Sequence, residues 1–157
     1  MASGRHLMVD GSNIAHAWPE LRTMLARSRP AAHARLERAL STIHDHEGVR
    51  VTLVFDGSGK ELDLRCPGAS QTFSVVRTPT GMTADAFIEG WVGRSVPASN
   101  CWVATGDTAE GRTIEGLGAH WISPDDLAAW VRRTEAMLGS NLAGRVHAND
   151  RNWKRRP

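Results

Sequence analysis

The sequence predicts an α/β protein in which helices cover both faces of a mostly parallel central sheet. Short apolar segments alternate with helical patterns along the chain, and this alternation is typical of a parallel sheet. The apolar segments are rich in valine and show no strict polar–apolar alternation, as expected for strands that are buried on both faces. A length of 157 residues suits one domain of this kind.

Five segments are predicted to form the strands of this sheet, the last of them on a weaker signal. They are HLMV (6–9), RVTLVF (50–55), TFSVV (72–76), CWVAT (101–105) and AHWI (119–122). The segment GSGKELDLRCPGASQ (57–71), between the second and third strands, is rich in polar residues and glycine. We predict an exposed and mobile loop there, with an irregular helical turn at most.

Three segments between the strands carry helix signals. Residues 30–48 begin with Pro30 and end at a glycine, and both residue types are favoured at those helix ends. Residues 83–93 begin with Thr83, which is a good N-cap. Residues 123–138 begin with SPDD, so that an N-cap serine and a proline precede two first-turn aspartates, which the helix dipole favours.

The composition is that of a globular protein, with 41% hydrophobic and 23% charged residues. No apolar run approaches the roughly 20 residues that a membrane helix needs, and the N-terminal MASGRH lacks the apolar core of a signal peptide. Cys66 and Cys101 have neither the spacing of a zinc site nor that of a disulfide framework. We therefore expect two reduced thiols in a cytoplasmic protein with no membrane partner.

The C-terminal segment carries an excess of positive charge. Residues 145–157 hold five Lys or Arg against one acidic residue, whereas residues 1–144 hold fourteen against sixteen. This asymmetry predicts a polyanionic partner, and the alternative is a solvated chain end. We predict a domain over residues 1–138, followed over 139–157 by the flexible connector GSNLAG and a basic tail.

Acidic residues follow the ends of the predicted strands. Asp10, Asp56 and Asp107 each come directly after a strand or its exit turn, and Asp85 lies in the first turn of a predicted helix. Because ligands of parallel sheets bind beyond the carboxyl ends of the strands, these carboxylates are predicted to meet at one edge, with Asn13 beside them. Like charges disfavour one another there, and Mg²⁺ or Mn²⁺ would offset the repulsion. The alternative is that each aspartate only caps a helix or forms a turn.

A second motif does not support nucleotide binding. The segment DGSGK (56–60) is similar to a phosphate-binding loop, but that motif requires a glycine where this chain has Val54 and a Ser or Thr where it has Glu61. We therefore expect no nucleotide cofactor.

The segments LMVDGSNIAHAWPEL, RVTLVFDG, TADAFIE and WVATGD, in this order, resemble the NYN domain family. They are most similar to the YacP-like branch of PIN-like bacterial endoribonucleases, which includes a ribosome-associated, mRNA-cleaving type. The resemblance covers about residues 5–138 and implies a PIN-like, Rossmann-type three-layer sandwich. It also implies an acidic metal centre. The residues that match this centre are Asp10, Asn13, Asp85 and Asp107 as the catalytic group, with Asp56 as a further metal ligand nearby.

The chain departs from the branch at several of these motifs. Ser12 stands where members often have tyrosine, Ala86 stands where they often have glutamate, and their TSD is TGD here. We predict that Glu89, Glu110 or both supply the acid that is missing at position 86. Thr105 is a further accessory candidate, because its hydroxyl or carbonyl can hold a water at this edge.

The predicted function is that of an Mg²⁺- or Mn²⁺-dependent endoribonuclease that leaves 5′-phosphate and 3′-hydroxyl ends. RNA as substrate, and mRNA and the ribosome as partners, come from the resemblance. The basic tail would contact RNA phosphates and stack on a base, although its tryptophan could instead pack against the domain. The tail residues in question are Arg145, Arg151, Trp153, Lys154, Arg155 and Arg156. The alternatives are an RNA- or ribosome-binding module with weak or no catalysis and, last, a structure-specific DNA nuclease.

Overall fold

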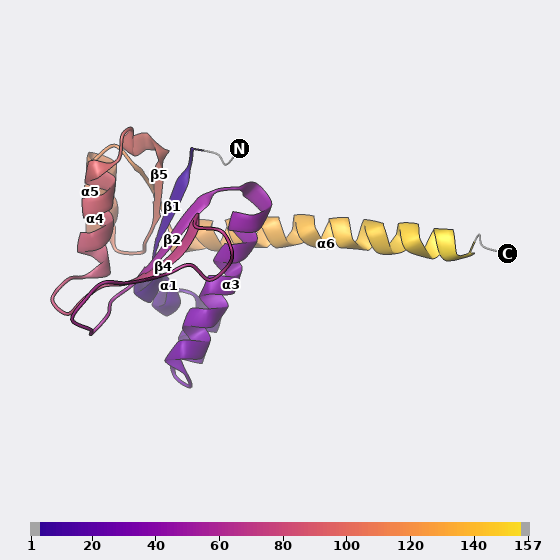
Figure 1. Ribbon diagram of the computed structural model, residues 1–157, viewed down its shortest axis with the longest axis horizontal. Coiled ribbons are helices and arrows are strands. Elements are labelled where there is room, and N and C mark those ends of the chain that lie inside the picture. Colours follow the sequence, from indigo (N-terminus) through magenta and orange to yellow (C-terminus); the bar gives the residue numbers. More distant parts are fainter. Residues whose placement is uncertain (1–3, 155–157) are drawn as a thin grey trace.

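The computed structural model describes the backbone of residues 4–154 and the side chains of residues 4–139 (Figure 1). Within this part of the chain, six strands form one sheet in the order β3-β4-β2-β1-β5-β6. Each neighbouring pair is parallel except β3 and β4. The strands are β1 (His6–Asp10), β2 (Arg50–Phe55), β3 (Asp63–Arg65), β4 (Phe73–Arg77), β5 (Cys101–Ala104) and β6 (His120–Ile122).

Helices cover both faces of the sheet, so that the predicted three-layer α/β sandwich is confirmed (Figure 1). One face packs against α1 (Gly11–Ala17), α2 (Pro19–Leu25), α3 (Arg29–Glu47) and α6 (Pro124–Lys154). The other face packs against α4 (Ala84–Arg94) and α5 (Thr108–Gly116), and the short 3₁₀ helix η1 (Ala98–Asn100) precedes β5. No helix among the described residues is both long enough and apolar enough to cross a membrane.

The central strand β1 shows why the strand signals were continuous apolar runs. Leu7 and Val9 face the cluster that includes α1 and α3, whereas Met8 faces the cluster that includes α4 and α5. All three side chains are buried, because a parallel strand covered on both faces has no solvent side. The five strands that the sequence predicts are confirmed, each to within one residue at either end.

The structure corrects the prediction at residues 57–71, where β3 is embedded in the expected loop. Its three residues are exposed and pair antiparallel with the edge strand β4. A strand this short, without buried positions, has no periodic pattern that the sequence could reveal. The sheet therefore has six strands in the described residues and not five. Helices α1, α2 and α5, of seven to nine residues, were also not predicted.

The structure also corrects the predicted connector, because α6 is one helix of 31 residues. It has a length of about 46 Å at 1.5 Å per residue, and its C-terminal half projects from the body of the protein (Figure 1). Segment 139–144 is therefore helical and not a flexible linker. Its two glycines weaken the helix by roughly 1 kcal/mol each, but the segment contains no proline that would end the helix.

The division into a domain over 1–138 and a tail over 139–157 stays a prediction. The six predicted RNA-binding residues, Arg145, Arg151, Trp153, Lys154, Arg155 and Arg156, lie outside the described side chains.

The strand order places a ligand-binding crevice beside β1. From β1 the chain proceeds to β2 and β4 on one side, and then returns through α4 to β5 on the other side. The carboxyl ends of β1 and β5 therefore flank the point where the winding direction reverses. Ligands of open α/β sheets bind at such a switch point.

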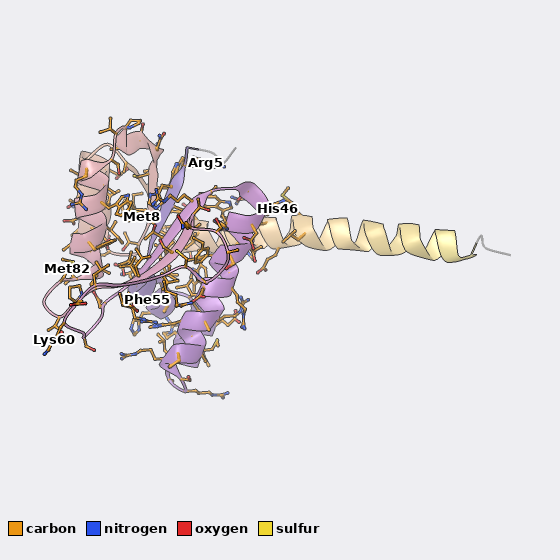
Figure 2. The ribbon with its side chains drawn as sticks, viewed as in Figure 1. Arg5, Met8, His46, Phe55, Lys60 and Met82 are labelled. Carbon is orange, nitrogen blue, oxygen red and sulfur yellow. The ribbon has the colours of Figure 1, made fainter. Side chains whose placement is uncertain are left out.

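The glycine that follows β1 is required by close packing at the same edge. A Cβ atom on Gly11 would lie 2.4 Å from Cε1 of the Phe55 ring, so a larger residue cannot fit without moving that ring. Phe55 ends β2 and is buried. Figure 2 shows it near the ends of the strands, away from Arg5 at their beginning.

Candidate metal centre

Four carboxyl groups meet at the switch point, and we call them the acidic centre: Asp10, Asp85, Asp107 and Glu110. Asp10 ends β1, Asp85 lies in the first turn of α4, and Asp107 and Glu110 begin α5. Carboxylate oxygens of Asp85, Asp107 and Glu110 all lie within 4.8 Å of one another. Asp10 joins them through a hydrogen bond with Glu110. The predicted meeting of Asp10, Asp85 and Asp107 is thus found in the structure.

Asn13 connects the segments that follow β1 and β5 through hydrogen bonds. Its Oδ1 accepts a hydrogen bond of 2.6 Å from the backbone N–H of Gly106, and its own backbone N–H donates to Asp10 Oδ1 at 3.3 Å. A Cβ atom on Gly106 would lie 3.0 Å from Asn13 Oδ1, so the glycine of TGD permits this short contact. Through these two hydrogen bonds Asn13 holds β1 next to the Asp107 loop, and its predicted catalytic role stays a prediction.

Asp56 holds the beginning of α4 in place. Its Oδ1 accepts a hydrogen bond of 2.7 Å from the backbone N–H of Ala84, while Thr83 Oγ1 accepts one from Ala86 at 3.0 Å. These two contacts fix the first turn of α4 and therefore the position of Asp85. Asp56 is exposed and is not part of the three-residue group within 4.8 Å. Its predicted role as a metal ligand stays a prediction, whereas its capping role is seen directly.

Thr105 positions Glu110. The hydroxyl of Thr105 donates to Glu110 Oε2 at 2.8 Å and accepts from the backbone N–H of Asp107 at 3.1 Å. The carbonyl oxygen of Thr105 accepts from Trp121 Nε1 at 2.9 Å. Both oxygens of Thr105 therefore make hydrogen bonds within the protein, and the hydroxyl orients Glu110. The predicted water contact of Thr105 stays a prediction.

Two buried carboxylate oxygens have no hydrogen-bond partner among the described residues: Asp85 Oδ1 and Glu110 Oε1. An unpartnered buried polar atom is costly, and a buried carboxylate oxygen is especially so. Both residues belong to the cluster of acids that each offer a carboxylate oxygen within 4.8 Å of the others. A divalent cation would satisfy both oxygens and offset the repulsion, so the residues present fit an oxygen-preferring metal such as Mg²⁺ or Mn²⁺.

The electrostatics of the acidic centre confirm that its charges are crowded. Glu110 is only 1% exposed, and its burial together with the neighbouring Asp10 carboxylate raises its pKa to about 9. Burial also raises the pKa of Asp10, although hydrogen bonds with Glu110 and Asn13 partly oppose this. Partial burial, followed by the hydrogen bond that the protonated Glu89 side chain donates to Asp85, raises the pKa of Glu89. These raised pKa values favour a protonated Glu110 at neutral pH when no metal is bound.

The stability of the metal-free protein is expected to fall as the pH rises. The folded pKa of Glu110, about 9, lies above its ordinary value of 4.5, so the folded state holds a proton that the unfolded state has lost. The corresponding stability is complete below about pH 4.5 and is lost as the pH passes through about 9, with a slope of up to about 1.4 kcal/mol per pH unit. Urea unfolding in EDTA between pH 5 and 9 measures this slope. A flat profile would contradict a protonated Glu110.

The two acids predicted to replace the one missing at position 86 both lie near the acidic centre, and their functional role stays a prediction. Ala86 is exposed on α4, whereas Glu89, one turn later, is hydrogen-bonded to Asp85. Glu110 was predicted as an accessory residue and lies at the centre of the group. Glu110 lies three residues after the N-cap Asp107, as in a capping box, so the sequence alone does not indicate that its side chain is buried. The sequence feature that could have shown the burial of Glu110 is its position four residues before Ile114, on the buried face of α5.

A PIN-like parallel sheet with acidic residues at its switch point defines a nuclease-type domain. The chain belongs to the YacP-like NYN domain family, because that family's profile matches residues 7–156. It is 32% identical over 133 residues to the uncharacterized protein YacP of Bacillus subtilis strain 168, which covers 84% of this chain and 78% of YacP. The predicted resemblance is confirmed, and the domain is of an RNA-related, nuclease type.

Two crystal structures of Rae1 (YacP) from Bacillus subtilis are similar to this fold. A tryptophan-to-leucine variant of Rae1 matches with a TM-score of 0.77 at 28% identity, over 91% of this chain and 84% of that one. A second structure of Rae1 matches with a TM-score of 0.72 at 28% identity, over 94% and 90% of the two chains. The likeness thus extends over nearly the whole fold, α6 included in large part.

Proposed function

We propose that this protein is a metal-dependent endoribonuclease whose acidic centre holds Mg²⁺ or Mn²⁺. The observation that carries the proposal is the pair of buried oxygens without partners, Asp85 Oδ1 and Glu110 Oε1, in a cluster of carboxylates at the switch point. The residues that would hold the ion are those of the acidic centre. A bound divalent ion supplies activation of a water and stabilisation of charge on phosphoryl oxygens.

Residues next to the acidic centre position its carboxylates. Thr105 holds Glu110 Oε2 and leaves Oε1 for a ligand, while Asn13 fixes the Asp107 loop. The hydrogen bond between Glu89 and Asp85 keeps a proton next to the centre. Because the pKa of Glu110 is raised, this carboxyl group would have to lose its proton to hold an ion, so ion binding is expected to release protons and to be favoured at higher pH.

RNA is proposed as substrate because the family is RNA-related, and hydrolysis would leave 5′-phosphate and 3′-hydroxyl ends. Ribosome-bound mRNA is the candidate target that the YacP-like branch suggests. The test is incubation with end-labelled single-stranded RNA in Mn²⁺, Mg²⁺ or EDTA, followed by analysis of both product ends. We expect internal cleavage with either metal and none in EDTA. RNA binding without metal-dependent cleavage would instead favour a non-catalytic RNA-binding module.

The basic C-terminal segment is expected to contribute affinity and not chemistry. Deleting residues 145–157 removes five cations, and each phosphate contact on a single strand contributes about 0.7 to the salt slope. The slope of log K against log salt should therefore fall by about 2 to 3, because not every one of these cations is expected to contact a phosphate. Turnover at saturating RNA should stay within a few-fold, because the acidic centre lies on the sheet. An unchanged slope would identify a solvated end, and a lost turnover in a folded protein would place the segment in the active site.

A further inference from the structure

A hollow of about 280 Å³ lies beside the acidic centre, and we call it the basic hollow. Its polar lining consists of Ser12, His16, Arg29, His33, Asp56 and Arg77. Two of these residues connect it to the acidic centre. Ser12 lies two positions after Asp10, and Asp56 caps α4 and acts through its charge on the pKa of Asp10. A ligand that fills the hollow would therefore extend toward the acidic centre.

The ring of Phe55 contacts two side chains that line the hollow, His33 and Arg77. The His33 ring stacks on Phe55 with a centroid distance of 3.9 Å and an angle of 17°. The guanidinium carbon of Arg77 lies 4.9 Å from the centroid of the same ring. Arg77 Nη2 and His33 Nδ1 are 3.5 Å apart. Phe55 is buried, and its ring keeps Arg77 of β4 and His33 of α3 next to each other.

The positive charge of the hollow is not neutralised by ion pairs within the described residues. The ion pairs found there are Arg35–Glu20, Arg65–Glu37 and His44–Asp45, and none includes Arg29 or Arg77. The one acid in the lining, Asp56, already accepts a hydrogen bond from Ala84. Guanidinium groups with free donors beside a polar hollow are suited to bind an anion with several oxygens.

Two features show that this arrangement is unfavourable without an anion. Arg29 is the first residue of the 19-residue helix α3, where the helix dipole disfavours a cation. Burial, followed by the charges of Arg77 and Arg29, lowers the pKa of His33 to about 4. The other titratable groups facing this ring in the hollow are His16 and Asp56. A phosphate in the hollow would offset the repulsion among these cations and the unfavourable interaction of Arg29 with the helix dipole.

We propose that the basic hollow binds a backbone phosphate of single-stranded RNA and so directs the strand across the acidic centre. This inference rests on the proposed function for its choice of RNA as the source of the phosphate. Arg29 and Arg77 donate to the phosphate oxygens, and Phe55 keeps Arg77 in position. The size of the hollow suits a phosphate and part of a sugar, and base identity is not read there.

The test measures RNA binding in EDTA, so that it does not depend on cleavage. Fluorescence anisotropy with a labelled single-stranded RNA is recorded for the wild type, Arg29→Gln, Arg77→Gln and the double variant over a salt series. Each substitution should weaken binding about tenfold, because each removes a charge-assisted hydrogen bond. The double variant should lower the salt slope by about 0.7, which corresponds to one phosphate.

Arg94→Gln is the matched control, because Arg94 is an exposed cation at the end of α4 opposite Asp85. It should bind RNA within about twofold of the wild type. Arg29 is exposed, so Arg29→Gln tests the inference even if Arg77→Gln perturbs the packing on Phe55, and melting temperatures identify such a loss of fold.

Wild-type affinity and salt slope in Arg29→Gln and the double variant would overturn the proposal. Loss of direct inorganic-phosphate binding in Arg29→Gln together with unchanged RNA affinity would also overturn it, because the hollow would then bind free phosphate only. The expected binding pattern in a protein that fails to cleave RNA would uphold the basic hollow while rejecting the proposed nuclease activity.

Discussion

Asp107→Asn and Asp10→Asn are each expected to lower RNA cleavage by at least about 10³-fold while the protein stays folded. Both carboxylates belong to the acidic centre, and a metal's charge stabilisation of several kcal/mol corresponds to about this factor. Asparagine is as good an N-cap as aspartate. It can therefore keep the hydrogen bonds that Asp107 Oδ1 accepts from Ala109 and Glu110, at 2.9 Å and 3.3 Å. Initial rates in Mn²⁺ and melting temperatures in EDTA measure the two effects.

The melting temperature of both variants in EDTA should equal or exceed that of the wild type, because each substitution removes a like charge from a crowded site. Asp63→Asn is the matched control, since it removes an exposed carboxylate from β3 on the same sheet. It should leave the cleavage rate within about twofold. If both centre variants unfold instead, the two aspartates are structural caps, and the acidic centre is not a functional site.

Two substitutions of Glu110 are expected to distinguish its role in stability from its role in cleavage. Glu110→Gln imitates the protonated carboxyl group and can still accept the hydrogen bond from Thr105. It should therefore be stable without metal, and it should lose the pH-dependent stability described above. It should also lose cleavage by about 10²- to 10³-fold and most of the stabilisation that millimolar Mn²⁺ gives to the wild type by mass action.

Glu110→Ala, in contrast, should destabilise the protein by about 2–4 kcal/mol. It leaves a cavity and removes the acceptor of the buried Thr105 hydroxyl. Thermal melts with and without Mn²⁺ distinguish the two variants. An equal Mn²⁺-induced rise in the wild type and in Glu110→Gln would mean that Glu110 is not a metal ligand.

The sequence alone determined the elements whose signals are local. Apolar runs predicted β1, β2, β4, β5 and β6, and cap residues such as Thr83 predicted where the longer helices begin, as α4 confirms. The meeting of Asp10, Asp85 and Asp107 was also predictable. It follows from a general property of parallel sheets, in which the carboxyl ends of all strands lie at one edge.

Only the tertiary structure decided which groups complete the two sites. Glu110 has the spacing of a capping residue, but Thr105 and Asp10 hold it in the interior. Asp56 was predicted as a metal ligand, and the structure adds a second role, because its carboxylate accepts a hydrogen bond from a backbone N–H 28 residues away.

The basic hollow had no local signal, because His33 and Arg77 are 44 residues apart in the sequence. They meet because β4 pairs with β2 in a register that sets Arg77 beside Phe55, while α3 packs across the same ring. Such contacts depend on strand pairing and helix packing over long sequence separations. A local pattern of residues carries no information about them, since the free energy of each contact is realised only when the whole sheet has formed.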